Sequence, residues 1–232
     1  MKLSIIIPAY NEERTIRELI RSVQAVNYPV DYEIIVIDDA SVDRSYEKEI
    51  LIKLRNRNHD IRIFKNRINK GKGFSIRKGI KRARGDLIIV QDADDELDPN
   101  DIPKLLEPIL KGEADVVYGS RFLNCPYPHG MAFPNWLANK FLTKMANILF
   151  GLRLTDVETC YKVFRTNIVK SLPLKACRFT FDPEVTALLS KNKIGIKELP
   201  VSYCGRTAKR GKKIKARDFV FALLILLKYK VF

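Results

Sequence analysis

Short apolar runs alternate with longer amphipathic stretches over the first half of the 232-residue chain. The apolar runs are rich in β-branched residues and end at turn residues, which predicts strands, whereas apolar residues three or four positions apart predict helices. We expect strands at Leu3–Ile7, Glu33–Ile37, Ile61–Phe64, Leu87–Val90 and Asp115–Tyr118, and helices at Glu12–Ala25, Arg44–Leu54, Lys72–Arg84 and Ile102–Leu110. Continuously apolar strands separated by helices indicate an α/β fold with a buried, mostly parallel sheet flanked by helices.

Two apolar stretches in the second half of the chain are interleaved with or flanked by Lys. Asn135–Phe150 and Asp218–Phe232 predict amphipathic helices, which either cover a core or a dimer interface or lie in the headgroup zone of a membrane. The longest uninterrupted apolar run, Phe219–Leu227, has nine residues. A membrane-spanning helix needs about 20, so we expect no transmembrane span.

The net charge of +15 is unevenly distributed along the chain. Residues 1–100 carry 19 basic and 17 acidic side chains, whereas residues 101–232 carry 23 and 10. With 46% hydrophobic residues the chain is not disordered, and the basic second half suggests an anionic partner. A nucleic-acid-binding module is a distant alternative, because acids at the strand ends would repel a polyanion and the aromatic-interleaved basic strands of common RNA modules are absent from the sequence.

The cysteines and the N-terminal segment bear on location. Cys125, Cys160, Cys177 and Cys204 form no C-x-x-C pair, so we expect reduced, mostly buried thiols rather than disulfides or a zinc site. Leu3–Ile7 is too short for the apolar region of a signal peptide. We therefore expect a cytoplasmic protein with peripheral contact to the membrane surface. The sequence leaves the oligomeric state open.

Acidic residues follow three of the expected strands and meet at one edge of the sheet, because parallel strands have their carboxyl ends together. They are Glu12 after the first strand, Asp38 and Asp39 after the second, and Asp92, Asp94 and Glu96 after the fourth. Adjacent carboxylates repel, and a divalent cation such as Mg²⁺ or Mn²⁺ would relieve that repulsion. Alternate residues at an extended strand end point the same way, which would let Asp92 and Asp94 share one ion. The alternative is a solvated acidic turn before a helix.

Asn69–Gly73 (N-K-G-K-G) precedes an expected helix. Glycine at such a junction lets the backbone approach a ligand, and a helix N-terminus flanked by Lys favours an anion. The spacing is neither that of a Walker A loop nor G-x-G-x-x-G, so an ordinary tight loop remains the alternative.

Together these segments resemble the family-two glycosyltransferases of the GT-A fold. The resemblance is carried by I-I-I-P-A-Y-N-E at Ile5–Glu12, V-I-D-D-A-S at Val36–Ser41, N-K-G-K-G at Asn69–Gly73, Q-D-A-D at Gln91–Asp94 and Y-G-S-R-F at Tyr118–Phe122. Thr155–Phe164 (T-D-V-E-T-C-Y-K-V-F) and Phe181–Val185 (F-D-P-E-V) are similar to the branch containing dolichyl-phosphate mannose synthases and bacterial polyprenyl-phosphate glycosyltransferases. The resemblance extends over about residues 3–230.

The resemblance implies a donor site and a metal site. Nucleotide-sugar contacts would come from Pro8, Tyr10, Glu12, Ile37, Asp39, Lys70, Gly71, Asp92 and Ala93, and metal ligands from Asp92, Asp94 and Glu96. Glu96 stands where the dolichyl-phosphate mannose synthases have Gln, and Asp95 stands where the branch usually has an apolar residue. Both departures would make the metal site more acidic than the family pattern.

The resemblance also implies residues that act on the reacting groups, namely Asp94, Arg121, Asp156 and Arg206. Arg121 would face the acceptor phosphate, or alternatively be a surface residue, and Arg206 would close over the donor diphosphate from a loop at 205–217 with seven basic and no acidic residues. Asp156 would be the base for a hydroxyl acceptor, or would orient nearby cations. A lipid phosphate, being already ionised, would need no base.

These features lead to one principal hypothesis and one alternative. The first is an inverting, metal-dependent transfer of a hexose from a nucleotide sugar (GDP-mannose, then UDP-glucose) to a dolichyl or polyprenyl phosphate. The alternative is transfer to a saccharide hydroxyl with Asp156 as base. We expect a catalytic domain at 1–215, with a nucleotide-sugar half at 1–118 and an acceptor half at 119–215, followed by a membrane-associating helix at 216–232.

Overall fold

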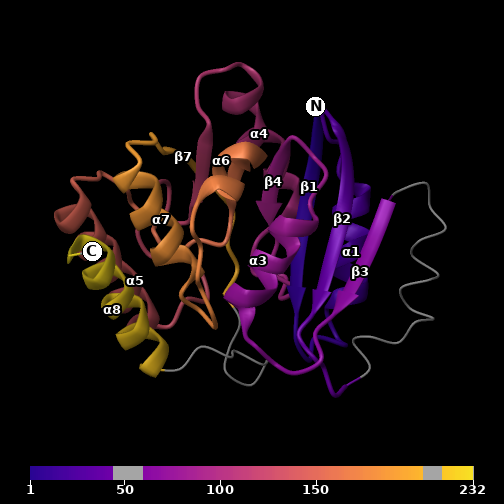
Figure 1. Cartoon of the computed structure of the whole chain (residues 1–232), viewed down its shortest axis with the longest axis horizontal. Helices are drawn as coiled ribbons and strands as arrows, with labels where there is room; N and C mark the ends of the chain where they lie inside the picture. The colour runs from indigo at the N-terminus through magenta and orange to yellow at the C-terminus, as the bar shows by residue number, and fades with distance from the viewer. Residues whose placement is uncertain (44–59, 206–215, 232) are drawn as a thin grey trace.

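The computed structural model describes residues 1–43, 60–205 and 216–231, which form a seven-stranded sheet flanked by helices (Figure 1). The strands are β1 (Lys2–Ala9), β2 (Asp31–Asp38), β3 (Asp60–Lys65), β4 (Leu87–Val90), β5 (Val116–Ser120), β6 (Lys162–Arg165) and β7 (Lys197–Pro200). Their spatial order is β3-β2-β1-β4-β6-β5-β7, and neighbouring strands are parallel except where β6 pairs with β4 and β5. The expected mostly parallel α/β sheet is confirmed.

Two of the strands, β6 and β7, lie outside the expected set. In β6, Val163 pairs with Ile89 of β4 on one side and with Val117 of β5 on the other. Each of these strands has four residues, of which two are charged (Lys162 and Arg165 in β6, Lys197 and Glu198 in β7), so neither gives the continuous apolar run that marks Leu87–Val90. Their position has a structural consequence, because β6 joins the second half of the chain to the first in one continuous sheet.

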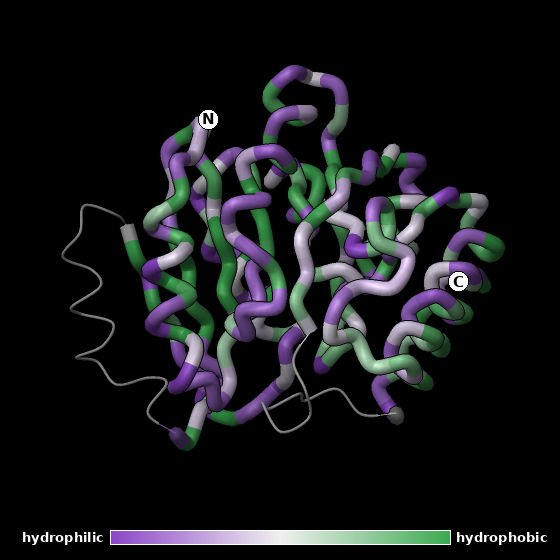
Figure 2. Tube along the Cα trace, turned by 180° about the vertical axis from the view of Figure 1, so that it is seen from behind, coloured by the Kyte–Doolittle hydropathy of each residue, from purple (hydrophilic) through white to green (hydrophobic). Residues whose placement is uncertain are grey.

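The helices pack against the sheet and against one another. They are α1 (Ile16–Ala25), α3 (Lys72–Arg82), α4 (Ile102–Leu110), α5 (Phe133–Phe150), α6 (Thr166–Ser171), α7 (Phe181–Lys191) and α8 (Ala216–Val231). In Figure 1, α3 lies in front of the sheet and α1 behind it, and Figure 2 shows mostly hydrophobic strands between them. Gly79 allows α3 to approach β1 closely, because a Cβ there would lie 2.4 Å from Cγ2 of Ile6.

The expected helix boundaries hold with local differences. The helix expected at Glu12–Ala25 begins at Ile16, because a turn over Glu12–Thr15 precedes it and the Thr15 hydroxyl donates to the carbonyl of Ala93 at 2.6 Å. The helix expected at Lys72–Arg84 ends at Arg82, where Ala83 turns to an extended conformation. The helix expected at Arg44–Leu54 lies outside the described residues.

Helices α5 and α8 contact each other and α7 at the end of the molecule away from β3 (Figure 1). Within the described ranges, no helix combines the length and hydrophobicity needed to cross a bilayer. The expectation of mostly buried cysteines is wrong, because Cys125, Cys177 and Cys204 are exposed and Cys160 alone of the four is buried. The first two lie in connections between elements and the third follows β7, where little packs over a side chain.

Candidate functional site

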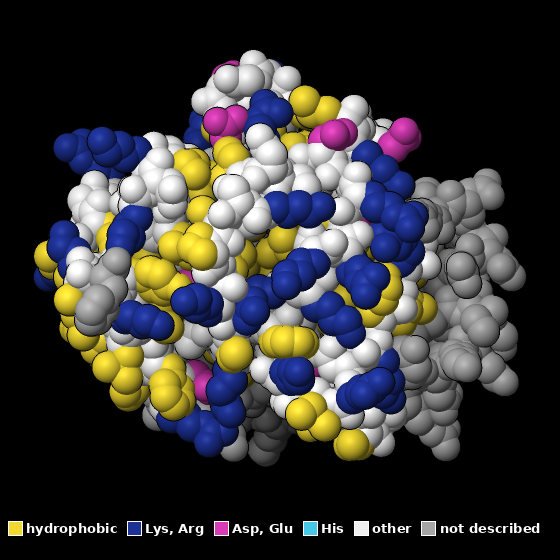
Figure 3. Space-filling view, viewed as in Figure 1, with side chains coloured by type: hydrophobic (Ala, Val, Ile, Leu, Met, Phe, Trp, Pro, Cys, Tyr) yellow, Lys and Arg dark blue, Asp and Glu magenta, His cyan; other side chains and the backbone are white. Residues whose placement is uncertain are grey.

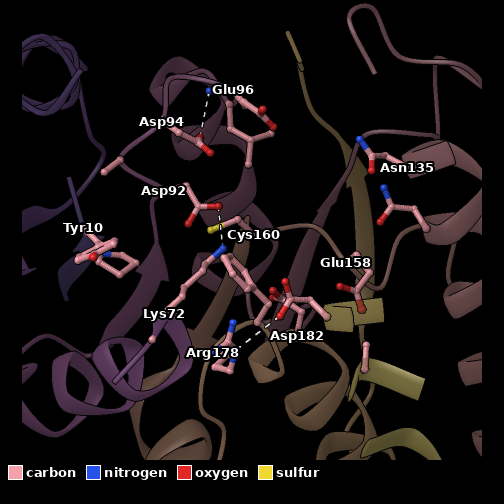
Figure 4. A pocket seen from close by; sticks show the side chains of 18 of the residues that line it. Tyr10, Lys72, Asp92, Asp94, Glu96, Asn135, Glu158, Cys160, Arg178 and Asp182 are labelled. Carbon is pink, nitrogen blue, oxygen red and sulfur yellow. Dashed lines mark hydrogen bonds and ion pairs between the residues drawn. The ribbon is translucent and has the colours of Figure 1, made fainter. Parts of the chain in front are cut away.

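A cavity of about 690 Å³ opens at the carboxyl ends of the parallel strands (Figure 4). Segments that follow β1, β2, β4 and β5 line it, as do the start of α3, the segment before α7, and parts of α5 and α8. Ten of the predicted site residues lie on its surface: Pro8, Tyr10, Glu12, Asp39, Gly71, Asp92, Ala93, Asp94, Glu96 and Arg121. The topology therefore brings together residues from five separate sequence motifs.

Neither Asp92 nor Asp94 is part of an extended strand. β4 ends at Val90, Asp92 lies in an irregular segment and Asp94 in a turn, so the expectation that strand alternation aligns the two carboxylates is wrong. Both still line the cavity. Asp92 accepts from Nζ of Lys72 at 2.7 Å, and Oδ1 of Asp94 accepts from the backbone N–H of Glu96 at 3.3 Å.

The ion pair with Asp92 keeps Lys72 charged. Burial alone would lower the pKa of Lys72, but the carboxylate of Asp92 outweighs it and raises that pKa well above its ordinary value. Lys72 is the first residue of α3, so its position follows from the N-K-G-K-G segment. Lys72 is not among the residues predicted for the site, although it belongs to the N-K-G-K-G motif.

Residues 92–96, which we call the acidic turn, are connected to the segment that follows β7 through Glu96 and Tyr203. The Tyr203 hydroxyl donates to Oε2 of Glu96 at 2.8 Å, and the backbone N–H of Cys204 donates to the Glu96 carbonyl at 3.0 Å. Asp95 is exposed and does not line the cavity. Its φ of 54° is in the left-handed region, which Asp tolerates better than an apolar residue does. The added acidity expected from Asp95 thus lies outside the cavity surface.

Asp39 holds the N-K-G loop in place. Its carboxylate accepts from the backbone N–H groups of Lys70 at 3.0 Å and Gly71 at 2.6 Å, and from Nδ2 of Asn66 at 2.7 Å. Gly71 adopts a φ of 88°, and a Cβ there would lie 2.6 Å from both Cα and N of Arg178. Only glycine fits between this loop and the segment before α7. The Lys70 side chain lies over the ring of Phe74 and does not line the cavity.

Arg121 is fixed by a bidentate ion pair with Asp156. Nε and Nη2 of Arg121 donate to Oδ2 and Oδ1 of Asp156 at 2.7 and 2.8 Å, and the Arg121 backbone N–H donates to Oδ2 at 3.1 Å. Asp156 is fully buried, and its own N–H donates to Glu198 at 3.1 Å. Burial would lower the pKa of Arg121, but Asp156 outweighs burial and raises it, so the guanidinium remains charged at the cavity surface.

The acidic turn offers oxygen donors but no complete metal cage. Among the residues that the structure describes, no three His, Cys, Asp or Glu side chains come together closely enough to hold an ion by themselves. Mg²⁺ usually takes one or two protein carboxylates together with phosphate oxygens of the substrate and water. Asp92 and Asp94 fit this partial role, since both are hard oxygen ligands on one cavity surface.

Two further residues predicted for the site are Ile37 and Arg206. Ile37 is fully buried in the core and does not line the cavity, whereas Arg206 lies outside the described residues. The structure also adds cavity residues that sequence reasoning did not single out, including Glu158 and Arg178. Both belong to or adjoin the T-D-V-E-T and F-D-P-E motifs, so proximity to these motifs was the available signal.

The seven-stranded α/β sheet, with the cavity at the carboxyl ends of its parallel strands, has the GT-A fold of glycosyltransferases, which known proteins share. Residues 4–172 match the family model described as glycosyl transferase family 2. The chain belongs to this family and is a glycosyltransferase.

Two curated relatives and one solved structure extend the comparison. The chain is 30% identical to the UDP-N-acetylglucosamine–dolichyl-phosphate N-acetylglucosaminyltransferase of Methanococcus voltae, covering 97% of this chain and 95% of the relative. It is also 30% identical to the dolichol-phosphate mannosyltransferase of Pyrococcus furiosus, covering 94% of this chain but 60% of that longer protein. The same fold occurs in glucosyl-3-phosphoglycerate synthase of Mycobacterium tuberculosis, crystallised with Mn²⁺, UDP-glucose and phosphoglyceric acid. The TM-score is 0.72 at 20% identity, and the match covers 99% of this chain and 80% of that chain.

Proposed function

We propose that this glycosyltransferase moves a hexose from a nucleotide sugar onto a dolichyl or polyprenyl phosphate. The observation that carries the proposal is a single cavity with Lys72, Asp92 and Asp94 on one part of its surface and Arg121 on another. Such a cavity suits a reaction between two anionic partners, a sugar diphosphate and a phosphate monoester. The names of both curated relatives contain a dolichyl phosphate, which supports the choice of acceptor.

We assign the nucleotide sugar to the part of the cavity formed by residues 1–118. Pro8, Tyr10, Glu12 and Asp39 would surround the nucleoside, and the acidic turn would approach the diphosphate, with Mg²⁺ or Mn²⁺ held by Asp92 and Asp94. A bound divalent ion supplies electrostatic stabilisation of the leaving diphosphate. Lys72 adds a positive charge at the same place. Its ammonium group, now paired with Asp92, would turn toward the phosphates when the donor binds.

We assign the acceptor phosphate to Arg121, in the half formed by residues 119–215. The pair with Asp156 holds the guanidinium in one orientation, so that its remaining N–H groups can meet phosphate oxygens. A phosphate monoester is ionised near neutral pH and can attack without a base, which suits direct displacement with inversion at the sugar. GDP-mannose is the first donor we propose and UDP-glucose the second. The two curated relatives differ in the sugar that they name, so they support the acceptor more than the donor.

The acceptor hypothesis also requires contact with a membrane. Exposed apolar side chains of α5 and α8 form what we call the α5–α8 surface: Phe133, Leu137, Phe141, Ile148, Val220, Phe221, Leu224, Leu227 and Val231. Hydrophobic and basic side chains lie close together at this end of the molecule in Figure 3. The same two helices line the cavity through Leu142 and Phe219, among others. We propose that this surface lies in the headgroup zone, which would bring the lipid phosphate to the cavity.

A transfer assay tests this function. The purified protein is incubated with labelled GDP-mannose, UDP-glucose or UDP-N-acetylglucosamine, with Mg²⁺ or Mn²⁺, and with a polyprenyl phosphate. We expect organic-soluble label from one donor, dependence on the metal, and inverted configuration at the anomeric carbon. Asp94→Asn should abolish transfer, with Asp98→Asn, an exposed acid that does not line the cavity, as the matched control. Absence of organic-soluble label from every donor would contradict the lipid-phosphate acceptor.

Transfer to a saccharide hydroxyl is the second candidate, and the burial of Asp156 disfavours it. Both oxygens of Asp156 are engaged by Arg121, so the carboxylate does not reach the cavity surface to accept a proton. Label appearing in water-soluble oligosaccharide, with none in lipid, would favour this candidate.

A further inference from the structure

Glu158 lies in the cavity next to the proposed acceptor site but takes no part in the chemistry described above. It belongs to the T-D-V-E-T segment that also supplies Asp156. Figure 4 shows Glu158 across the cavity from Tyr10, with Asp92 and Asp94 between them. Oε1 of Glu158 is shielded from solvent and has no hydrogen-bond partner among the described residues. A buried carboxylate oxygen without a partner, on the surface of a cavity, indicates a ligand.

Among the described residues, every cation near Glu158 is paired with another carboxylate. Arg121 at the end of β5 is paired with Asp156, and Lys162 of β6 is paired with Asp182 of α7 at 2.5 Å. From α8, Asp218 lines the same cavity and pairs with Arg178 at 3.6 Å. Ionised Glu158 would therefore add a negative charge among three carboxylates whose cations are already engaged. Electrostatics favour the neutral carboxylic acid.

We propose that Glu158 retains its proton in the working enzyme and donates a hydrogen bond through it to the phosphate group of the acceptor at Arg121. This inference rests on the proposed function, because that phosphate is its ligand. Arg121 supplies a positive charge in a fixed orientation. The Glu158 hydroxyl supplies a neutral hydrogen-bond donor beside Arg121, where the described cavity surface offers no further unpaired cation. A protonated carboxyl is suited to this position because it binds an anion without adding repulsion.

The proton on Glu158 determines the sign of the pH dependence of acceptor binding. Burial, followed by the charge of Asp182, raises the pKa of Glu158 to about 8. Below that pH the acid is protonated and binds phosphate, whereas above it the group loses its donor and repels the phosphate. The acceptor KM should therefore rise about tenfold per pH unit above this pKa. A general base would give the opposite sign, since turnover would increase as Glu158 ionises.

Glu158→Gln provides the decisive variant, because the amide keeps a donor of similar shape but cannot titrate. Transfer to a short-chain prenyl phosphate is measured at saturating donor from about pH 6.5 to about pH 9.5. We expect Glu158→Gln to keep the wild-type KM at low pH and to lose the alkaline rise. Glu158→Ala should have a raised KM throughout. Glu107→Gln, an exposed acid on α4 paired with Lys111, should reproduce the wild-type profile.

Two results would overturn the proposal. One is an alkaline rise of KM in Glu158→Gln equal to that of wild type, which would assign the titration to another group. The other is loss of turnover in Glu158→Gln with a normal KM, which would make Glu158 a base.

A binding measurement separates failure of this proposal from failure of the proposed function. Calorimetry at about pH 8.5, in buffers with different ionisation enthalpies, reports proton uptake when inorganic phosphate or the short-chain prenyl phosphate binds. Uptake by wild type and none by Glu158→Gln would support the Glu158 contact even if no transfer occurred. Transfer to lipid without any proton uptake would leave the function standing and overturn the contact. Tighter binding of the prenyl phosphate than of inorganic phosphate would identify the lipid as the source of the phosphate.

Discussion

At the scale of single residues, the site consists of ion pairs whose members differ in availability. Lys72 and Asp92 are each about one-fifth exposed, so the pair can separate when a ligand enters the cavity. Arg121 is one-tenth exposed and Asp156 is fully buried, so that pair remains fixed. Under the proposed function, the first pair would respond to the donor, whereas the second would orient a cation for the acceptor. The next two predictions follow from this difference.

Replacing Lys72 should weaken donor chemistry more than folding. Lys72→Met removes the charge that we assign to the leaving diphosphate, so we expect turnover to fall roughly 100-fold, with donor affinity reduced. Steady-state transfer and calorimetric binding of the nucleotide diphosphate would measure both effects. Lys81→Met is the control, because Lys81 is exposed on the same helix and does not line the cavity. Equal effects in the two variants would contradict the assignment.

Replacing Asp156 should separate its two hypothetical roles. Asp156→Asn leaves the largely buried Arg121 without its counter-charge, so we expect a loss of unfolding free energy of about 3–5 kcal/mol. We also expect a raised acceptor KM with donor binding retained, because the guanidinium loses its orientation. Denaturant unfolding and substrate titrations would test this. A variant with normal stability and normal acceptor KM but no turnover would instead support Asp156 as a base.

At the scale of elements, the loop before α3 and the segment before α7 fit together through backbone contacts. The N–H of Gly73 donates to the carbonyl of Arg178 at 2.6 Å, and Gly71 faces the Arg178 backbone. Arg178 itself adopts a φ of 47°, in the left-handed region. The contact joins residues of the 1–118 part of the chain to residues of the 119–215 part directly beside Lys72. Adding one methyl group at Gly71 should therefore shift backbone atoms that line the cavity.

Alanine substitutions at two glycines would isolate this contact. Gly71→Ala introduces both the strain of a positive φ and a clash with Arg178, whereas Gly112→Ala introduces a similar strain in open space. We expect Gly112→Ala to lower the free energy of unfolding by about 1–2 kcal/mol. Gly71→Ala should lower the free energy of unfolding by more than Gly112→Ala does, and it should also weaken nucleotide binding. Thermal unfolding with and without nucleotide diphosphate would compare them, and identical behaviour would argue against the loop contact.

At the scale of the whole molecule, one cavity lies between the sheet and the α5–α8 surface. The sheet supplies the acidic turn and Arg121, and the two helices close the opposite part and carry exposed apolar side chains outward. Lys140, Lys144, Lys228 and Lys230 belong to the same helices. This combination of exposed apolar and basic residues favours an anionic lipid surface.

Vesicle binding should therefore depend on the α5–α8 surface. We expect the protein to co-sediment with vesicles that contain anionic lipids and to be released from them partly by salt. Leu137→Glu combined with Leu224→Glu should reduce binding at least about tenfold, because both side chains are more than half exposed and each substitution adds a charge. Transfer to a water-soluble short-chain prenyl phosphate should be unchanged in this variant. Unaltered vesicle binding would contradict the proposed orientation.

The sequence by itself determined most elements in the first half of the chain and the edge of the sheet at which the cavity opens. Continuous apolar runs such as Leu87–Val90 coincide with strands because local composition and burial on both faces leave few alternatives. Parallel strands share one end, so the positions of Asp39 and Asp92 at the same cavity followed without coordinates. Arg121, which the motifs also singled out, lines the same cavity.

Only the tertiary structure decided which side chains pair and which remain available. Asp156 and Arg121 lie 35 positions apart, and Lys72 and Asp92 lie 20 apart, so neither pair has a local signal. The short strand β6, antiparallel in a parallel sheet, brings the T-D-V-E-T segment to the cavity, with Asp156 buried and Glu158 lining it. Burial and partner charges are properties of the packed molecule. For this reason Asp156 could be interpreted as a base from the sequence, whereas the structure shows that Arg121 engages its carboxylate and that Glu158 lines the cavity.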